Sequence, residues 1–256
     1  GMVPVFAMDA AGGAVSKIVA NGSNTELDSA DGQLVFLGET SSRAPELFAL
    51  DAASGTSRQL TRFNEALFAG LDLGKVESHE FPGAGGDTVQ VWVTYPPGFD
   101  PKKKYPLVQL LHGGPHTMVR DAFSPRWNTH VFASPGYIVA SVNRHGSTGF
   151  GEAFARSING AWGDKPTEDV LKANDYLFGK IPAIDRDNVA AAGASYGGYL
   201  ATWLLGHTKA FKTLVNHAGV SDFMGQYGAD ITTYGFTSEV LGGTPWQNPE
   251  AMQRNN

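Results

Sequence analysis

The fold is decided at Val189-Ala190-Ala191-Ala192-Gly193-Ala194-Ser195-Tyr196-Gly197-Gly198-Tyr199. Small apolar residues before Ser195 predict a buried strand, and the apolar run after it predicts a helix. Gly193 and Gly197 flank Ser195 as Gly-x-Ser-x-Gly, the pattern of a nucleophile elbow. The crowded backbone of such a turn leaves no room for a Cβ at either glycine, and the helix N-terminus helps to stabilise an oxyanion beside the serine. A glycine-rich turn without chemistry is the alternative, so the partners of Ser195 must be sought elsewhere.

Composition and charge exclude several classes of protein. The 256 residues are 42% hydrophobic and 17% charged, as in soluble globular proteins, and the net charge of −6 argues against a nucleic-acid surface. No apolar run approaches the roughly 20 residues of a membrane span. The absence of cysteine excludes disulfides, thiolate metal sites and a cysteine nucleophile, and it leaves periplasm and cytoplasm both open. The start Gly1-Met2-Val3-Pro4 indicates a fragment boundary rather than a signal peptide.

Residues 1–65 are expected to form part of a β-propeller. Two strands, Val3–Asp9 and Glu46–Asp51, are each followed by a small-residue turn and a polar strand. The copies stand roughly 40 residues apart, a period typical of propeller blades. Leu34–Leu37 adds an inner strand, so the segment holds about one and a half blades and cannot close a propeller by itself. The turns and polar strands are residues 10–13, 16–19, 52–55 and 57–61.

Residues 66–256 are expected to form an α/β domain, with a linker up to about residue 75. A helix begins at Asp164, and Val170, Ala173 and Leu177 recur in it at helical spacing. Because strands alternate with helices, the sheet should be mostly parallel, with ligands at the carboxyl ends of its strands. The predicted strands are residues 89–95, 105–111, 137–142, the one before Ser195, and 213–217. The side chains at their carboxyl ends are His112, Asn143, Ser195 and His217.

An oxyanion hole can be assembled from two of these strand ends. In α/β-hydrolases one donor is the backbone N–H of the residue after the nucleophile, here Tyr196. The second comes from a glycine-rich loop after an earlier strand, where Gly113 and Gly114 stand. The alternative is a strand-to-helix turn whose glycines satisfy dihedral needs only. Two correctly ordered glycine loops favour the catalytic interpretation.

Four motifs together resemble the prolyl oligopeptidase family of serine peptidases, and within it the acylaminoacyl-peptidase and dipeptidyl peptidase V branch. The resemblance implies an N-terminal β-propeller that gates an α/β-hydrolase domain, and cleavage of short peptides near their N-terminus without metal or cofactor. Family members have Asn-Pro where this chain has Asn143-Arg144, which leaves the contacts of that loop open. The motifs are His112-Gly113-Gly114-Pro115, Gly146-Ser147-Thr148-Gly149-Phe150-Gly151, Trp162-Gly163 and the elbow, with 211–217 and 241–246 in support.

The resemblance also implies an S1 pocket, which holds the side chain before the scissile bond. Tyr196, Val220, Phe223 and Tyr227 would build it, and their apolar or aromatic character fits a hydrophobic or small side chain. The alternative is that a Val/Phe/Tyr set at spacings of three and four is the inner face of a helix.

A base for Ser195 is missing. In this fold the order along the chain is Ser, then Asp or Glu, then His, and residues 196–256 contain no such order at strand ends. His217 follows the serine without an acid before it, and Asp222 is a weak candidate for the acid. The resemblance places both groups beyond Asn256, so the chain is expected to be an internal fragment with little or no activity, since an unactivated serine is a poor nucleophile.

Three hypotheses remain for the function. The first is a serine peptidase that acts on a peptide substrate through an acyl-enzyme on Ser195. The second is an esterase of the same fold, which a gating propeller disfavours. The third is a non-catalytic protein that kept the fold and lost the triad. The oligomeric state is open, with a homodimer as one option for the full-length protein.

Overall fold

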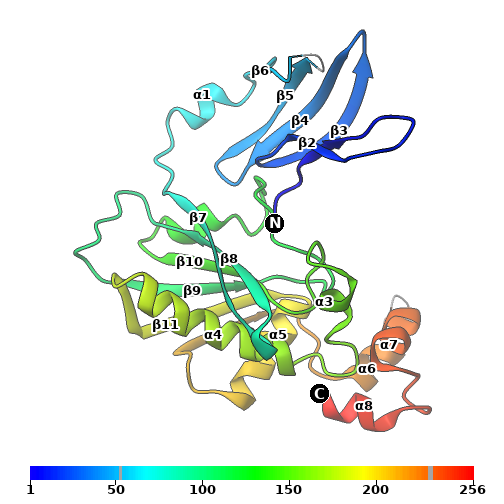
Figure 1. Cartoon of the computed structure of the whole chain (residues 1–256). Helices are drawn as coiled ribbons and strands as arrows, with labels where there is room; N and C mark the ends of the chain where they lie inside the picture. Colours follow the sequence, from blue (N-terminus) through cyan, green and yellow to red (C-terminus); the bar gives the residue numbers. More distant parts are fainter. Residues whose placement is uncertain (52–53, 230–232) are drawn as a thin grey trace.

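The chain folds into two parts in the computed structural model, which describes residues 1–51, 54–229 and 233–256. An N-terminal part built of antiparallel strands lies above a larger part in which helices flank a central sheet (Figure 1). A segment that contains the short helix α1 (Glu65–Phe68) joins them, where the sequence predicted a linker.

The N-terminal part contains two separate sheets. In the first, β1 (Val5–Ala7) pairs antiparallel with β2 (Ser16–Val19), and in the second β5 pairs antiparallel with β6, so strands lie within each of the two predicted strand–turn–strand segments. The predicted turn at 52–55 lies partly outside the described residues, because 52 and 53 are not included. The second sheet has the order β3-β4-β5-β6, with β3 (Ser23–Ala30), β4 (Gln33–Thr40), β5 (Arg43–Asp51) and β6 (Ser57–Gln59). Their assignment to one and a half propeller blades, and the boundary at 65, stay predictions.

Glu46 ties the end of this part to the linker. Its side chain is buried, and its carboxylate accepts hydrogen bonds from the Thr61 hydroxyl and from the backbone N–H groups of Phe63 and Asn64. These hydrogen bonds, that of Thr61 first, lower the pKa of Glu46 and keep it ionised. The carboxylate therefore satisfies backbone donors at the point where the strand pattern ends.

The central sheet has six strands in the order β12-β11-β9-β10-β8-β7. The four strands β9 to β12 run parallel, while β8 is antiparallel to β10 and β7 is antiparallel to β8. β7 was missed in the sequence because charged and polar residues interrupt its apolar pattern, as is common for edge strands. The strands are β7 (Val76–Pro82), β8 (Thr88–Thr94), β9 (Tyr105–Leu111), β10 (Ile138–Asn143), β11 (Ile184–Ala194) and β12 (Thr213–His217).

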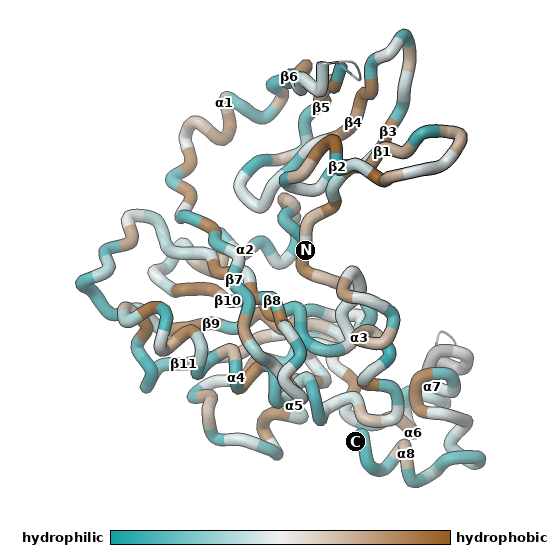
Figure 2. The backbone as a smooth tube through the Cα atoms, viewed as in Figure 1, coloured by the Kyte–Doolittle hydropathy of each residue, from teal (hydrophilic) through white to brown (hydrophobic). Residues whose placement is uncertain are grey.

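Side-chain alternation along the strands assigns the two faces of this sheet. Odd-numbered Leu107 packs with Ala173 and Leu177 of α4, whereas even-numbered Leu110 packs with Ala133 of α2 on the opposite face. Val170, Ala173 and Leu177 are all fully buried, which confirms the predicted apolar stripe. Figure 2 shows the hydrophobic colour concentrated along these inner strands. The remaining elements are η1 (Ala84–Gly86), α2 (Thr129–Ala133), α3 (Glu152–Arg156), α4 (Asp164–Lys180), α5 (Tyr196–His207), α6 (Phe223–Ala229), α7 (Thr233–Leu241) and α8 (Pro249–Arg254).

The parallel strands bring their carboxyl ends together, so His112, Asn143, Ser195 and His217 follow or end neighbouring strands, as predicted. Among the described helices, none has both the length and the apolar character that crossing a bilayer requires.

Candidate active site

Ser195 stands alone at the apex between β11 and α5 in a backbone conformation that few non-glycine residues adopt. Its φ is 57° and its ψ is −121°, and the residue is exposed. Its N–H donates to the carbonyl of His217 over 3.0 Å, and its own carbonyl accepts from the N–H of Tyr199 over 2.9 Å. Strand β12 on one side and helix α5 on the other therefore hold the strained apex in place. This is the geometry that the elbow motif predicts.

The glycines beside Ser195 permit close contacts between backbone segments. A Cβ at Gly193 would lie 2.3 Å from the carbonyl oxygen of Gly197, and a Cβ at Gly197 would lie 1.9 Å from that of Leu111. Both distances are far below van der Waals contact, so neither site accepts a side chain without moving backbone. Gly197 thus lets the first turn of α5 pack directly on the end of β9.

The loop after β9 lies against the elbow. A Cβ built on Gly113 would be 3.6 Å from Cβ of Ser195 and 3.1 Å from the carbonyl oxygen of Ala194. Gly114 follows with φ of 122°, a value open to glycine but rarely to other residues. Tyr196 is the first residue of α5, so its N–H has no acceptor within the helix. The structure brings Gly113 next to Ser195, where its backbone could donate beside the N–H of Tyr196.

His112, between β9 and this loop, is held as a neutral ring. Its Nδ1 lies 2.8 Å from the carbonyl oxygen of Gly113, which can only accept, so Nδ1 carries the proton. The other nitrogen, Nε2, lies 2.8 Å from Oγ of Ser147 and accepts its hydrogen. Burial, and then the positive charge of Arg144, lower the pKa of His112 well below 6.5. This ring orders the loop rather than serving as a base for Ser195.

A second histidine, His145, is held by hydrogen bonds to two carboxylates near the carboxyl end of β10. Asp169 of α4 is fully buried, and its Oδ2 accepts from the backbone N–H of His145 over 2.6 Å and from its Nδ1 over 2.7 Å. The other oxygen of Asp169 accepts from the N–H of Ala84, and Asp87 lies 3.0 Å from Nε2 of His145. Sequence reasoning missed this network, because Asp169 and His145 lie 24 positions apart on different elements.

The four residues predicted for the S1 pocket lie in two places. Tyr196 and Phe223 are buried, and each packs edge-to-face on the ring of Trp162, with centroids 5.3 and 5.0 Å away. Val220 is partly buried against the same cluster, whereas the ring of Tyr227 packs on Trp246. Burial raises the pKa of Tyr196 to about 12, so its hydroxyl stays neutral and donates to the carbonyl of Trp162 over 2.5 Å. The role of these four residues in binding stays a prediction.

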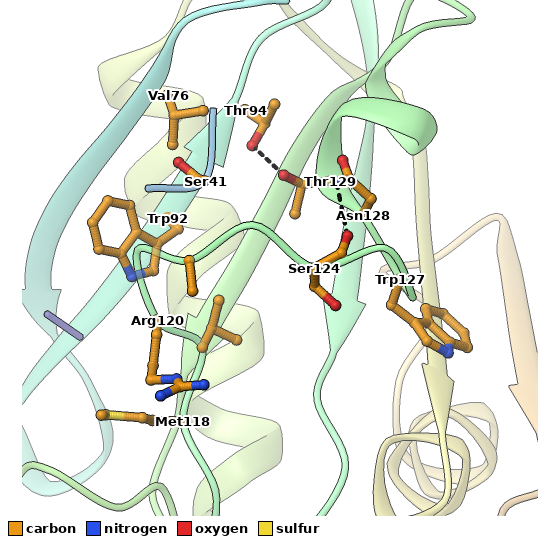
Figure 3. Close-up of a pocket in the computed structure, with 12 residues that line it drawn as sticks. Ser41, Val76, Trp92, Thr94, Met118, Arg120, Ser124, Trp127, Asn128 and Thr129 are labelled. Carbon is orange, nitrogen blue, oxygen red and sulfur yellow. Dashed lines mark hydrogen bonds between the residues drawn. The ribbon is translucent and has the colours of Figure 1, made fainter. Parts of the chain in front are cut away.

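A pocket of about 360 Å³ opens beside Ser195. None of the four residues predicted for S1 is among the described residues that line it. A second pocket of about 240 Å³ is shown in Figure 3. It adjoins the first, and the two share Val119, Ser124, Trp127 and Thr129. The second pocket reaches Ser41, between β4 and β5 of the N-terminal part. The lining of the first pocket is Leu110, Leu111, His112, Gly113, Val119, Ser124, Arg126, Trp127, Thr129, Ser141, Ala194 and Ser195.

Within the part of the chain that the structure describes, Oγ of Ser195 has no hydrogen-bond partner, and the rings of His112, His116 and His145 hydrogen-bond to other groups. The ring of His217 packs edge-to-face on Trp127. Asp222, the weak candidate for the acid, accepts from the N–H of Met224 at the start of α6. No group of three His, Asp or Glu side chains among the described residues is placed to hold a metal ion.

The sequence is similar to known proteins. The model of the prolyl oligopeptidase family matches residues 122–256. Dipeptidyl-peptidase 5 of Schizosaccharomyces pombe is 39% identical over 187 residues, which cover 72% of this chain and 27% of that protein. Dipeptidyl-peptidase 5 of Porphyromonas endodontalis is 36% identical over 207 residues, which cover 80% of this chain and 30% of that protein. The chain therefore spans less than a third of the length of these relatives.

Solved structures show the same arrangement of strands and helices. An acylaminoacyl peptidase in complex with Z-Gly-Gly-Phe-chloromethyl ketone superposes with a TM-score of 0.88 at 28% identity, over 100% of this chain and 40% of that one. The acylaminoacyl peptidase of Pyrococcus horikoshii gives a TM-score of 0.85 at 28% identity, over 94% of this chain and 38% of that one.

Proposed function

Since this chain belongs to the prolyl oligopeptidase family, we propose that it forms the nucleophile-bearing part of a serine peptidase, with Ser195 as the attacking group. The observation that carries the proposal is the exposed, strained Ser195 at the start of α5, with Gly113 packed against it. Strain at a non-glycine apex persists only where the surrounding structure over-determines it, which is typical of functional sites.

In the proposed reaction, a general base takes the proton of the Ser195 hydroxyl as Oγ attacks the carbonyl carbon of the scissile bond. The oxygen becomes negative and accepts hydrogen bonds from the backbone N–H of Tyr196 and of Gly113 or Gly114. The amine leaves with a proton from a general acid, and water then releases the acyl group from Ser195. The base and acid come from the remainder of the full-length protein. The 256 residues alone are then expected to give at most trace hydrolysis, from the oxyanion hole and binding.

The proposed substrates are short peptides cut near the N-terminus, with release of a dipeptide or of an acylated amino acid. The names of the relatives, dipeptidyl-peptidase 5 and acylaminoacyl peptidase, support these two modes. A hydrophobic or small side chain before the scissile bond would fit the apolar and aromatic set of Tyr196, Val220, Phe223 and Tyr227. The phenylalanine of the Z-Gly-Gly-Phe-chloromethyl ketone bound to one relative is of this kind.

The test is an assay of the full-length gene product beside its Ser195→Ala variant. The substrates are dipeptidyl and acyl-aminoacyl chromogenic amides with Phe, Ala or Lys before the scissile bond, together with a small nitrophenyl ester. We expect the parent to cleave amides and the variant to lose at least about 1,000-fold in kcat. Equal rates from the two proteins would eliminate the mechanism. If only the ester is hydrolysed, the protein is an esterase and not a peptidase.

A further inference from the structure

Arg144 is a buried cation that follows β10 directly. Only 1% of its surface is exposed, and its guanidinium donates to three backbone carbonyls. Nη2 donates to the carbonyl of His112 over 3.1 Å, and Nη1 donates to those of His145 and Pro115 over 3.0 and 3.4 Å. The carbonyls of His112 and Pro115 flank Gly113 and Gly114. Two of the three hydrogen bonds therefore hold the loop that lies against Ser195.

The same guanidinium also contacts the other half of the site. Its central carbon lies 4.2 Å from the ring centroid of Tyr196, within the range of a cation–π interaction. The phenol of Tyr196 is fixed at its far end by the hydrogen bond to the carbonyl of Trp162. Because β9 lies between β10 and β11 in the sheet, a side chain at the end of β10 can cross under the loop after β9 and reach the residue after Ser195.

Stability alone is a poor reason for a cation in this place. The described part of the chain gives Arg144 no salt bridge to a carboxylate, and its Nε has no hydrogen-bond partner. A buried charge without a direct counterion costs free energy that an apolar side chain of similar volume would not. An apolar side chain could not donate hydrogen bonds to the carbonyls of His112 and Pro115 in this loop. A planar fork of five donors can do so while one face lies on an aromatic ring.

We propose that Arg144 is a positioning residue that clamps the two halves of the oxyanion hole together, the loop of Gly113 and Gly114 on one side and Tyr196 on the other. The proposal rests on the proposed function, since it assigns a task within that same site. Arg144 touches neither substrate nor the reacting atoms. It acts by fixing the distance between the two backbone donors, on which stabilisation of the oxyanion depends.

The test compares Arg144→Lys with Arg186→Lys in the full-length protein. Arg186 is an exposed control, because it also donates to a carbonyl, that of Phe178 over 2.9 Å, and also lies over an aromatic ring, but it is far along β11 from Ser195. The oxyanion forms only as the reaction proceeds, so we expect Arg144→Lys to lower kcat by about 10- to 100-fold with KM within about threefold. The affinity for a peptide aldehyde, which mimics the tetrahedral state, should fall in parallel, and Arg186→Lys should match the parent.

A chemical rescue separates positioning from a general loss of structure. In Arg144→Ala, added guanidinium ion should restore part of kcat saturably, whereas ammonium at equal ionic strength should not. If Arg144→Lys is not recovered folded, the clamp is tested with Tyr196→Phe and Tyr196→Leu. Phe keeps the ring under the guanidinium, whereas Leu removes it. We expect the Phe variant to keep the higher kcat, and equal kcat in the two would contradict the clamp.

Failure of the clamp and failure of the proposed function give different results. If Ser195→Ala is inactive while Arg144→Lys keeps kcat and aldehyde affinity within twofold of the parent, the clamp is overturned and the nucleophile stands. If Ser195→Ala is as active as the parent, the proposed function falls, and the clamp falls with it.

Discussion

Replacing Gly197 by alanine should separate the loop after β9 from the elbow without touching Ser195. The new Cβ would lie 1.9 Å from the carbonyl oxygen of Leu111, whereas carbon–oxygen contacts settle at about 3.3 Å or more. Both atoms belong to backbone segments, so the first turn of α5 and the end of β9 must move apart by more than about 1 Å. Gly113, two residues after Leu111, must move with that strand end.

Two magnitudes follow from this displacement. A misplacement of about 1 Å between groups that act together can lower kcat by roughly 100-fold. Inserting a methyl group into a packed interior costs about 1–3 kcal/mol of unfolding free energy. The control is Gly206→Ala in the same helix, where a Cβ would meet no described heavy atom within 4 Å. That change should stabilise the protein by about 0.5–1 kcal/mol, because alanine is the better helix former.

The assay is kcat and KM on the chromogenic amides, with the unfolding free energy of each full-length variant from urea denaturation. We expect Gly197→Ala to lose kcat and stability together, and Gly206→Ala to lose neither. A Gly197→Ala variant with kcat within threefold of the parent would refute the argument, since the close packing of α5 on β9 would then not determine the geometry of the site.

Two further predictions concern the buried histidine and the isolated chain. Burial lowers the pKa of His145, but the carboxylates of Asp169 and Asp87 raise it above its ordinary value of 6.5. Protonation of His145 therefore stabilises the fold below pH 6.5, and this contribution is lost as the pH rises through the pKa of the folded state. The lowered pKa of His112 acts in the opposite sense, so the contribution of His145 is the difference in unfolding free energy between the parent and Asp169→Asn. Urea denaturation should give a difference of about 3–5 kcal/mol that is larger at pH 6 than at pH 8, and an equal difference at the two pH values would contradict the assignment. The 256-residue chain by itself should hydrolyse the amides only at trace rates, and robust turnover would reveal a base within these residues.

Much of the fold follows from local patterns in the sequence. The strands at 105–111 and 213–217 were predicted with the bounds that the structure has, because each is a short apolar run ended by polar or glycine residues. The edge strand β7 was missed because Glu77, His79 and Glu80 break its alternation. Its pairing with β8 supplies the hydrogen bonds that a local pattern does not reveal.

Only those parts of the candidate site that lie at the ends of predicted strands could be predicted from the sequence. Parallel strands must bring their carboxyl ends to one edge, so the proximity of the Gly113 loop to Ser195 followed from the order of strands and helices. The contacts of Arg144 and Asp169 did not follow, since nothing in their local sequence distinguishes them from solvated charges. The one signal was that Asn143-Arg144 departs from the Asn-Pro of the family which the motifs resemble.

The sequence by itself determined the elbow. The conformation of a tight strand-to-helix turn depends on which neighbouring residues lack a Cβ, and here these are Gly193 and Gly197. Only the tertiary structure decided what supports that elbow. Arg144 reaches Tyr196, 52 positions later, because β9 lies between β10 and β11 and places one loop between them. Strand order is set by the burial of whole faces against helices, and no local spacing contains it.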